Sequence, residues 1–407
     1  MAAAGHIRLG TASPGTQSST PATIALIDTL AQRASSSNID ILLLPEAFIG
    51  GYPRGSSFGC TIGDRTAAGR DEFAHYFDQA IDLGDIVGPA GGGAGVKWVR
   101  RQLGEEDEVR GDGSREELER IARDSGVFIV AGCIEKAGGS LYCSVVYVCP
   151  KEGMLGKRRK VLPTGSERLI WAQGSPSTLR AVSTTIRGIR INLAAAICWE
   201  SYMPLLRQSL YAQNINLYLA PTADNREAWL GLMRTVGVEG RCFVVSSNMC
   251  IPKEKAAETN GHAPVRERRG SCFTEDGFEI ALPKSPSRRR RRKSVFDEDG
   301  NEIVLCCDDD GEAPPAQPQT QTQTQTQPPA VESKAEFISR GGSSIVSPFG
   351  DVLSGPQWED PDGLLYADVD FRDCIRGRLD LDAAGSYSRN DSFKFSVEGL
   401  NLDPLPY

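Results

Sequence analysis

Apolar runs alternate with amphipathic stretches along roughly the first 250 residues of the chain. Short apolar runs are typical of buried strands, and apolar residues spaced three and four apart are typical of helices. We expect strands at 39–44, 127–131, 141–148, 191–197, 217–220 and 242–246. We expect helices at 115–124, 204–211 and 228–238, and a further one with Thr20 as its N-cap and Pro21 at its first position. This alternation favours a layered α/β fold.

The pattern stops at a polar segment, from about residue 253 to 336. It contains the basic run 288–293, the acidic run 308–310 and the Gln/Thr repeat 317–327. Such composition buries too little apolar surface to offset the chain's conformational entropy, so we predict a disordered insertion with a short hairpin near Cys272–Ala281. Apolar patterning resumes at about residue 341, and a strand is expected at 364–370. We therefore predict a single domain over residues 1–407, interrupted by this insertion.

Composition narrows the function classes. The formal net charge of −8 argues against a general nucleic-acid binder. The chain contains no apolar run of membrane-spanning length and no secretory signal at its start, so we expect a cytoplasmic protein with no membrane partner. The 11 cysteines show no framework spacing and are expected to be reduced. With only three histidines, a His-based metal site or a Ser-His-Asp triad has little support.

Two chemically active side chains follow apolar runs, and a third lies in a basic segment. Cys198 ends the run 191–197, Glu46 follows 41–45, and Lys160 ends the segment 156–160. In open α/β sheets, the carboxyl ends of the strands are where ligands bind. A carboxylate, an ammonium and a thiol together could carry out nucleophilic attack on an electrophilic carbon.

Each of these side chains has a possible role. A free thiol is mostly protonated at pH 7, so Glu46 could serve as the base that activates Cys198. Lys160 could stabilise the negative charge of a tetrahedral intermediate, with the backbone N–H of Trp199 as a second donor. Glu167, seven residues after Lys160, could orient Lys160 or position water or the departing amine.

Each residue also has a simpler interpretation. A cysteine in an apolar run is usually a small core residue. A glutamate after a strand is usually a solvated turn residue, and a basic cluster such as the one around Lys160 is usually solvated surface. The sequence around each residue therefore decides between the two interpretations.

That surrounding sequence resembles the nitrilases, the nitrilase branch of the carbon–nitrogen hydrolase superfamily. The segment Leu44–Gly55 (LPEAFIGGYPRG) resembles their first motif, and Gly156–Gly174 resembles their lysine segment. Ala195–Trp229, which begins AAICWESY, is similar to their cysteine segment. Segments 238–244 and 341–356 are also similar, so the resemblance covers about residues 7–395 apart from the polar insertion.

The resemblance implies an α/β fold, a four-layer α-β-β-α sandwich, with a Glu-Lys-Cys triad. By motif position the triad is Glu46, Lys160 and Cys198, with Glu167 as a supporting glutamate. The implied reaction converts a nitrile into a carboxylic acid and ammonia through a cysteine thioimidate and then a thioester. It needs no cofactor or metal. Tyr52 and Trp199 are candidates to line the substrate pocket, and the family's habit implies a homodimer or larger homo-oligomer.

Two positions depart from the family pattern. The lysine segment usually has His where this chain has Arg158, and the C-terminal Gly-His-Tyr-Ser-Arg-Pro-Asp is replaced by residues 385–391, GSYSRND. Neither position belongs to the predicted triad. They affect how the C-terminal segment packs and which nitrile is preferred.

Two alternatives stay open. Another enzyme of the superfamily, an amidase or a cyanide or nitrile hydratase, would use the same triad and release a different product. A scaffold protein would keep the fold and use the charged insertion to bind partners. Product analysis on a nitrile panel separates the enzymes, and the effect of Cys198→Ala separates enzyme from scaffold.

Overall fold

The chain is described from a computed structural model. It covers residues 6–84, 111–253 and 336–407, together with the short strands 271–273, 279–281, 293–296 and 302–305. The contacts within the chain form two units, one of Met1–Glu254 with Ala335–Tyr407, and one of Lys255–Lys334. We describe each unit by itself.

The first unit contains a six-stranded sheet with the strand order β19-β1-β2-β5-β6-β7. Neighbouring strands β1, β2 and β5 run parallel, and the other pairs are antiparallel. The strands are β1 (Ile7–Ala12), β2 (Ile41–Leu43), β5 (Phe128–Ala137), β6 (Ser140–Cys149), β7 (Gly153–Arg159) and β19 (Leu364–Val369).

A second sheet of seven strands has the order β12-β17-β11-β10-β9-β8, with β18 paired to β17. Its central strands β9, β10 and β11 are parallel, so their carboxyl ends meet at one edge. The strands are β8 (Val182–Ile186), β9 (Ile189–Ala195), β10 (Leu217–Thr222), β11 (Phe243–Asn248), β12 (Cys250–Pro252), β17 (Phe337–Val346) and β18 (Val352–Trp358).

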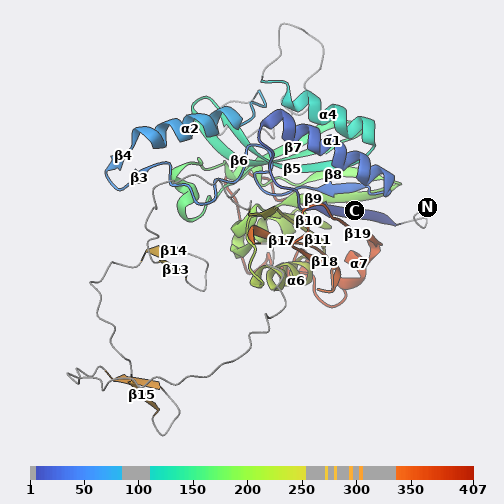
Figure 1. The fold of residues 1–407 in the computed structure, drawn as a ribbon. Coiled ribbons are helices and arrows are strands. Elements are labelled where there is room, and N and C mark those ends of the chain that lie inside the picture. Colours follow the sequence, from blue (N-terminus) through green and yellow to red (C-terminus); the bar gives the residue numbers. More distant parts are fainter. Residues whose placement is uncertain are drawn as a thin grey trace, which may run out of the picture. The chain divides into compact units, whose positions relative to one another are not determined.

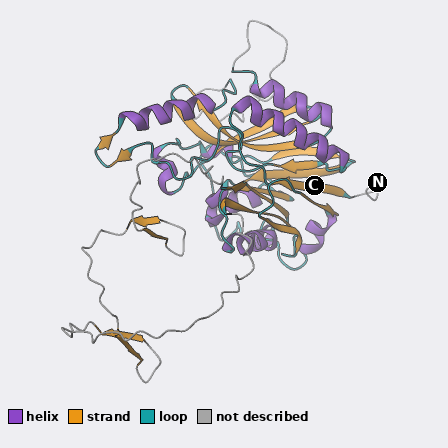
Figure 2. Cartoon of the chain, viewed as in Figure 1, coloured by secondary structure: helices purple, strands orange, loops and turns teal. Residues whose placement is uncertain are grey.

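Helices cover the outer face of each sheet (Figures 1 and 2). Helices α1 (Thr20–Ser36) and α4 (Ser114–Ser125) pack together over the first sheet, where their apolar faces join one core cluster. Helices α5 (Pro204–Ala212) and α6 (Ala228–Gly240) cover the second sheet in another cluster. A third cluster fills the space between the two sheets. The four-layer α-β-β-α sandwich is therefore confirmed.

The start of α1 differs slightly from the prediction. The N-cap is Ser19, whose hydroxyl accepts a hydrogen bond from the backbone N–H of Ala22, and Thr20 is already helical. The hydroxyl of Thr20 instead bonds to the backbone oxygen of Gln79, at 2.5 Å. The N-cap therefore lies one residue earlier than the sequence indicated, and the helix itself begins at Thr20.

Every strand and helix expected from the sequence is present, with bounds that differ by a few residues. Sequence patterning did not predict β1, α2 (Ala67–Gln79), the β3–β4 hairpin (Cys60–Thr61 and Asp64–Arg65), β8, β12, β18 or α7 (Arg372–Gly377). It also did not recognise β7, because the run of charged residues at the end of this strand resembles surface.

In the second unit, β13 (Ser271–Phe273) pairs antiparallel with β14 (Glu279–Ala281), which confirms the predicted hairpin. A second antiparallel pair joins β15 (Lys293–Phe296) to β16 (Glu302–Leu305). Most of the predicted insertion lies outside the described residues. The predicted single-domain organisation is not tested and stays a prediction. None of the helices in the described ranges has the length and apolar composition needed to cross a bilayer. The predicted cytoplasmic location stays a prediction.

Candidate active site

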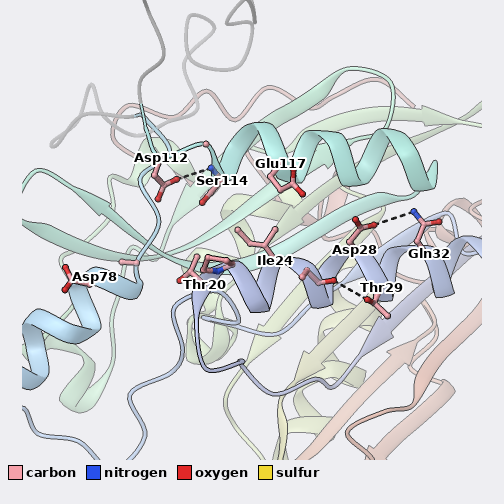
Figure 3. A pocket seen from close by; sticks show the side chains of 13 residues that line it. Thr20, Ile24, Asp28, Thr29, Gln32, Asp78, Asp112, Ser114 and Glu117 are labelled. Atoms are coloured by element: carbon pink, nitrogen blue, oxygen red, sulfur yellow. Dashed lines mark hydrogen bonds between the residues drawn. The ribbon is translucent and has the colours of Figure 1, made fainter. Parts of the chain in front are cut away.

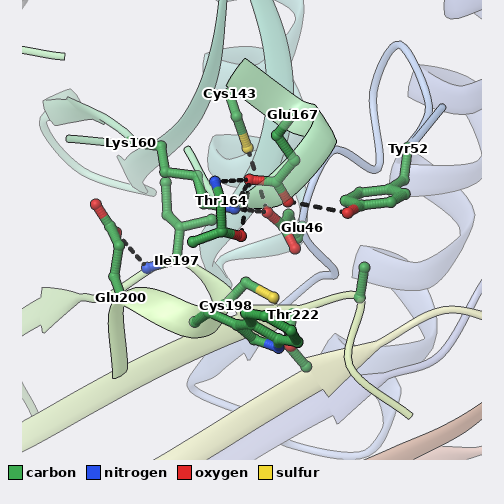
Figure 4. Close-up of polar contacts among 12 residues, drawn as sticks. Glu46, Tyr52, Cys143, Lys160, Thr164, Glu167, Ile197, Cys198, Glu200 and Thr222 are labelled. Atoms are coloured by element: carbon green, nitrogen blue, oxygen red, sulfur yellow. Dashed lines mark hydrogen bonds and ion pairs between the residues drawn. The ribbon is translucent and has the colours of Figure 1, made fainter. Parts of the chain in front are cut away.

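Four polar side chains predicted from separate segments converge between the two sheets (Figure 4). Glu46 follows β2, Lys160 follows β7, Glu167 lies in a 3-10 turn, and Cys198 follows β9. Glu46 and Lys160 are fully buried, and Glu167 and Cys198 are 6% and 4% exposed. The simpler interpretations of Glu46 and Lys160 as solvated residues are therefore wrong.

Glu46 is held in a tight turn that packs directly on β5. A side chain at Gly132 of β5 would place its Cβ 2.1 Å from the backbone oxygen of Pro45 and 2.8 Å from Cα of Glu46, so this position must be glycine. Oε1 of Glu46 accepts hydrogen bonds from Nζ of Lys160 at 2.7 Å and from the thiol of Cys143 at 3.6 Å. Oε2 is buried and has no hydrogen-bond partner among the described residues.

Burial raises the pKa of Glu46 above its ordinary value of 4.5, and the attraction of Lys160 offsets only part of that rise. A carboxylate with a raised pKa and one unused oxygen is suited to accept a proton and return it.

Lys160 joins the two glutamates. Its ammonium group donates to Oε1 of Glu46 and to Oε2 of Glu167, each at 2.7 Å. Burial alone would lower the pKa of Lys160, but the attraction of Glu46 and the other acidic groups outweighs burial and raises it well above 10.5. The group therefore stays an ammonium and cannot itself act as the base.

Glu167 is positioned by the turn that contains it. It is the third residue of the 3-10 helix Gly165–Leu169, and its Oε2 accepts the backbone N–H of Thr164 at 2.7 Å in a capping box. Its Oε1 accepts the hydroxyl of Tyr52 at 2.9 Å. Glu167 is thus held on both oxygens, one of which also accepts a hydrogen bond from Lys160.

Cys198 opens a 3-10 turn, Cys198–Tyr202, directly beyond the end of β9. Its φ of 55° is left-handed, a strained conformation for a residue with a side chain and one that recurs at functional sites. Burial raises the pKa of the thiol well above its usual value of 9.0, and the nearby charge of Glu46 raises it further. The resting side chain is therefore a thiol.

The two predicted pocket residues have different settings. Tyr52 is half-buried, its hydroxyl is bound to Glu167, and its ring meets Trp171 edge-on at 5.5 Å. Trp199 is half-buried beside the cysteine, and its indole N–H donates to Oδ2 of Asp224 at 2.8 Å. Their predicted contact with substrate stays a prediction.

Sequence reasoning assigned no role to Glu200, which connects the lysine and cysteine segments. It is fully buried, and its Oε1 accepts the backbone N–H of Val161 at 2.7 Å while its Oε2 accepts that of Ile197 at 2.8 Å. Arg158 forms an ion pair with it at 2.6 Å. Arg158 was noted only as a departure from the family pattern, and a charged partner 42 positions away cannot be identified from local sequence.

Thr222 was also missed. It is the last residue of β10, next to β9, and its hydroxyl donates to Sγ of Cys198 at 3.2 Å. Its place at the carboxyl end of a predicted strand was the available indication. Among the described residues, no group of three or more His, Cys, Asp or Glu side chains could hold a metal ion.

A separate cavity of about 840 Å³ lies between α1 and α4, away from these residues (Figure 3). Its lining includes the carboxylates of Asp28, Asp78, Asp112 and Glu117. Two of these, Asp28 and Glu117, are already paired with Arg120 at 2.7 Å. None of the four converging side chains lines this cavity, so it is not the candidate active site.

The chain is an α-β-β-α sandwich that buries a thiol, an ammonium and two carboxylates between its two sheets. The family described as carbon-nitrogen hydrolase matches residues 6–279, and the chain belongs to this family. A nitrilase of Bradyrhizobium diazoefficiens is 34% identical over 91% of this chain and 84% of its own length. An arylacetonitrilase of Trametes versicolor is 34% identical over 93% of this chain and 92% of its own. A bifunctional nitrilase/nitrile hydratase of Nicotiana tabacum is 33% identical over 95% and 84%.

Solved structures agree on the fold. A Saccharomyces cerevisiae member of branch 10 of the nitrilase superfamily has a TM-score of 0.55 at 14% identity, covering 96% of this chain and 97% of its own. An amidase of Nesterenkonia has a TM-score of 0.51 at 17% identity, covering 93% and 95%. Together with the nitrilase relatives, the family assignment supports a nitrilase-type enzyme.

Proposed function

We propose that this chain hydrolyses organic nitriles to carboxylic acids and ammonia through a covalent intermediate on Cys198. The observation that carries the proposal is the buried meeting of a thiol, an ammonium and a carboxylate with one unused oxygen. We infer nitriles as the substrate class because the relatives include nitrilases.

The charge balance of the site explains how the thiol is activated. Two carboxylates, Glu46 and Glu167, share the single ammonium of Lys160. A resting thiolate would add another negative charge to this buried group, so the thiol keeps its proton until substrate binds. Oε2 of Glu46 then takes that proton as Sγ attacks the nitrile carbon, and general base catalysis of this kind contributes about 10²- to 10⁴-fold.

The remaining steps use the same groups. Attack forms the S–C bond and breaks one C–N π bond, and the proton held by Glu46 passes to the nitrogen, giving a thioimidate. Water adds to this carbon, and the C–N bond breaks with release of ammonia, leaving a thioester. A second water then breaks the C–S bond, which gives the carboxylic acid and restores the thiol.

Lys160 and the backbone N–H of Trp199 are the donors we assign to the negative charge that develops on the substrate. Glu167 acts through Lys160 because both of its oxygens are already engaged. Tyr52 and Trp199 line the substrate pocket in this proposal. We also infer a homodimer or larger homo-oligomer, which light scattering of the purified protein tests.

The test is a panel of aliphatic, aromatic and arylacetonitrile substrates with ammonia, acid and amide measured together. Acid and ammonia in equal amounts support the proposal. Amide without ammonia would mean that the thiol leaves before the amine does, which is the nitrile hydratase outcome. The relative from Nicotiana tabacum is named for both nitrilase and nitrile hydratase activity. Turnover of amides alone would assign the chain to the amidases.

A further inference from the structure

Thr222 contacts the nucleophile from the opposite side to the charged groups. It ends β10 in the second sheet, whereas Glu46 and Lys160 follow strands of the first sheet (Figure 4). Its side chain is fully buried, and its Oγ1 lies 3.2 Å from Sγ of Cys198. Because β9 and β10 are parallel neighbours, their carboxyl ends place the threonine beside the cysteine.

The hydroxyl proton of Thr222 has a defined direction. A hydroxyl carries one proton and two acceptor positions. One acceptor position of Oγ1 is filled by the backbone N–H of Asp224 at 2.9 Å. The acceptor that the hydroxyl meets within the described part of the chain is Sγ of Cys198, so the O–H donates to sulfur.

The loop beyond Thr222 is held on both sides. The side-chain amide of Asn248 donates to the backbone oxygen of Asp224 at 3.0 Å. The guanidinium of Arg54 donates to the backbone oxygen of Ala223 at 2.6 Å. The backbone N–H that fixes the hydroxyl is therefore itself fixed, and the donor is ready before the reaction starts.

A neutral donor has a particular value at this sulfur. The ionisable groups that act on it include the acidic Glu46 and Glu167, the cationic Lys160, and the phenols Tyr52 and Tyr202. A second cation would neutralise Glu46, the base that must take the thiol proton. A hydroxyl stabilises the thiolate through a charge-assisted hydrogen bond and leaves the charge of the carboxylates unchanged.

We propose that Thr222 is a catalytic residue, which donates its hydrogen bond to the sulfur of Cys198 whenever that sulfur becomes a thiolate. This occurs twice in a turnover. The S–H bond breaks as Glu46 takes the proton and the S–C bond forms, and later the C–S bond breaks as water displaces the sulfur. The role in turnover rests on the proposed function, but the effect on the thiolate can be measured without any nitrile.

The experiment measures the rate at which iodoacetamide alkylates Cys198 between pH 6 and 10, quantified on the peptide that contains it by mass spectrometry. The variants are Thr222→Val, which removes the donor, and Thr222→Ser, which keeps it. The control is Thr23→Val in α1. Thr23 is equally buried, and its hydroxyl likewise accepts a backbone N–H (from Gln17, 3.1 Å) and donates to a backbone oxygen (of Ser19, 3.0 Å).

Thr222→Val is expected to be alkylated about 3- to 10-fold more slowly at pH 8, with the profile displaced to higher pH. This range follows from the strength of one hydrogen bond to a charged group, reduced because a more basic thiolate is also more nucleophilic. Thr222→Ser and Thr23→Val are expected to stay within about twofold of the wild-type rate. A purely structural role would not be rescued by serine and would not displace the pH profile.

Alkylation of Thr222→Val at the wild-type rate and with the wild-type profile would overturn the proposal, as would an equal displacement in Thr23→Val. If Thr222→Val lacks the native thermal transition, Thr222→Ala removes the same donor within the space that threonine occupies, and the same two outcomes decide. Failure of wild-type protein to release ammonia from nitriles would overturn the proposed function but would leave the alkylation result standing.

Discussion

Two buried clusters of charge lie side by side in the chain, yet they are balanced in opposite ways. Lys157 and Arg159, at the end of β7, both pair with Glu135 of β5, and the Arg159–Glu135 distance is 2.6 Å. Lys160, the next residue, pairs with two carboxylates, those of Glu46 and Glu167. Among the described residues, the first cluster pairs two cations with one carboxylate, and the second pairs two carboxylates with one cation.

The balance decides how each carboxyl group titrates. Burial alone would raise the pKa of Glu135, but Lys157 and Arg159 outweigh burial and lower it below 4.5. Burial raises the pKa of Glu46, and a single shared ammonium cannot reverse that. The hydroxyl of Ser144 also donates to Glu135 at 2.9 Å, whereas Oε2 of Glu46 has no partner in the described residues. From this difference we infer that the Glu135 cluster supports the fold, and we propose that the Glu46 cluster supplies the group that moves a proton.

Glu46→Gln breaks the second cluster with the largest expected effect. Loss of the base is expected to lower kcat by about 10²- to 10⁴-fold in a nitrile assay that measures ammonia. The free energy of unfolding should stay the same or rise, because Lys160 keeps its pair with Glu167. A variant that retains most of its kcat would remove Glu46 from the mechanism.

Glu135→Gln is the matched change in the first cluster, and its effect should be on stability. It removes the carboxylate that pairs with both Lys157 and Arg159, which is expected to cost about 3–5 kcal/mol of unfolding free energy. Urea unfolding followed by fluorescence measures this loss, and the kcat of the folded fraction should change little. If Glu135→Gln abolished turnover without destabilising the protein, the contrast between the clusters would be wrong.

The pH dependence of stability separates the same two glutamates. Because the pKa of Glu135 is lowered, its contribution is present above pH 4.5 and is lost as pH falls through its folded value. Because the pKa of Glu46 is raised, its contribution is present below pH 4.5 and is lost as pH rises through its folded value. The contribution of Glu46 to the free energy of unfolding changes by at most about 1.4 kcal/mol per pH unit. Melting temperatures measured from pH 5 to 8 should therefore fall less steeply for Glu46→Gln than for the wild type, and identical slopes would contradict the raised pKa.

Arg158→His is expected to have the smallest effect, and it tests whether the ion pair with Glu200 requires arginine at position 158. Histidine is the residue that the nitrilase lysine segment usually has, and Glu200 keeps its bonds to the backbone of Val161 and Ile197. We expect a loss of about 1–2 kcal/mol in unfolding free energy and a kcat within about tenfold. Arg158→Met, which removes the cation that pairs with Glu200 in the described structure, should cost more, and an equal cost would show that the charge of residue 158 is irrelevant.

Much of the fold could be predicted because its strands are continuous apolar runs. The segments 127–131 and 141–148 show no charged residue and were recognised, although the strands they belong to extend further. The charged end of β7 was not recognised. The three basic side chains at its end, and that of Lys160 directly after it, are each buried against a carboxylate 7 to 114 positions away, and local hydropathy does not detect such partners.

The candidate site followed the same rule. Glu46 and Cys198 were identified because each follows an apolar segment within a family motif, and Lys160 because the basic segment around it resembles the family's lysine segment. Their convergence depends on contacts such as Gly132 beneath the turn of Glu46, which no sequence pattern reveals. Glu200 and Thr222 were missed because their importance lies in the groups they meet in space.

The most direct test of the central claim is to quench the enzyme with acid during turnover of a nitrile and to map the peptide that carries Cys198 by mass spectrometry. We predict an added mass equal to the substrate's acyl or imidoyl group on Cys198, and neither adduct nor ammonia from Cys198→Ser. Full ammonia release by Cys198→Ser, or turnover by the wild type with the adduct on another residue, would contradict the account.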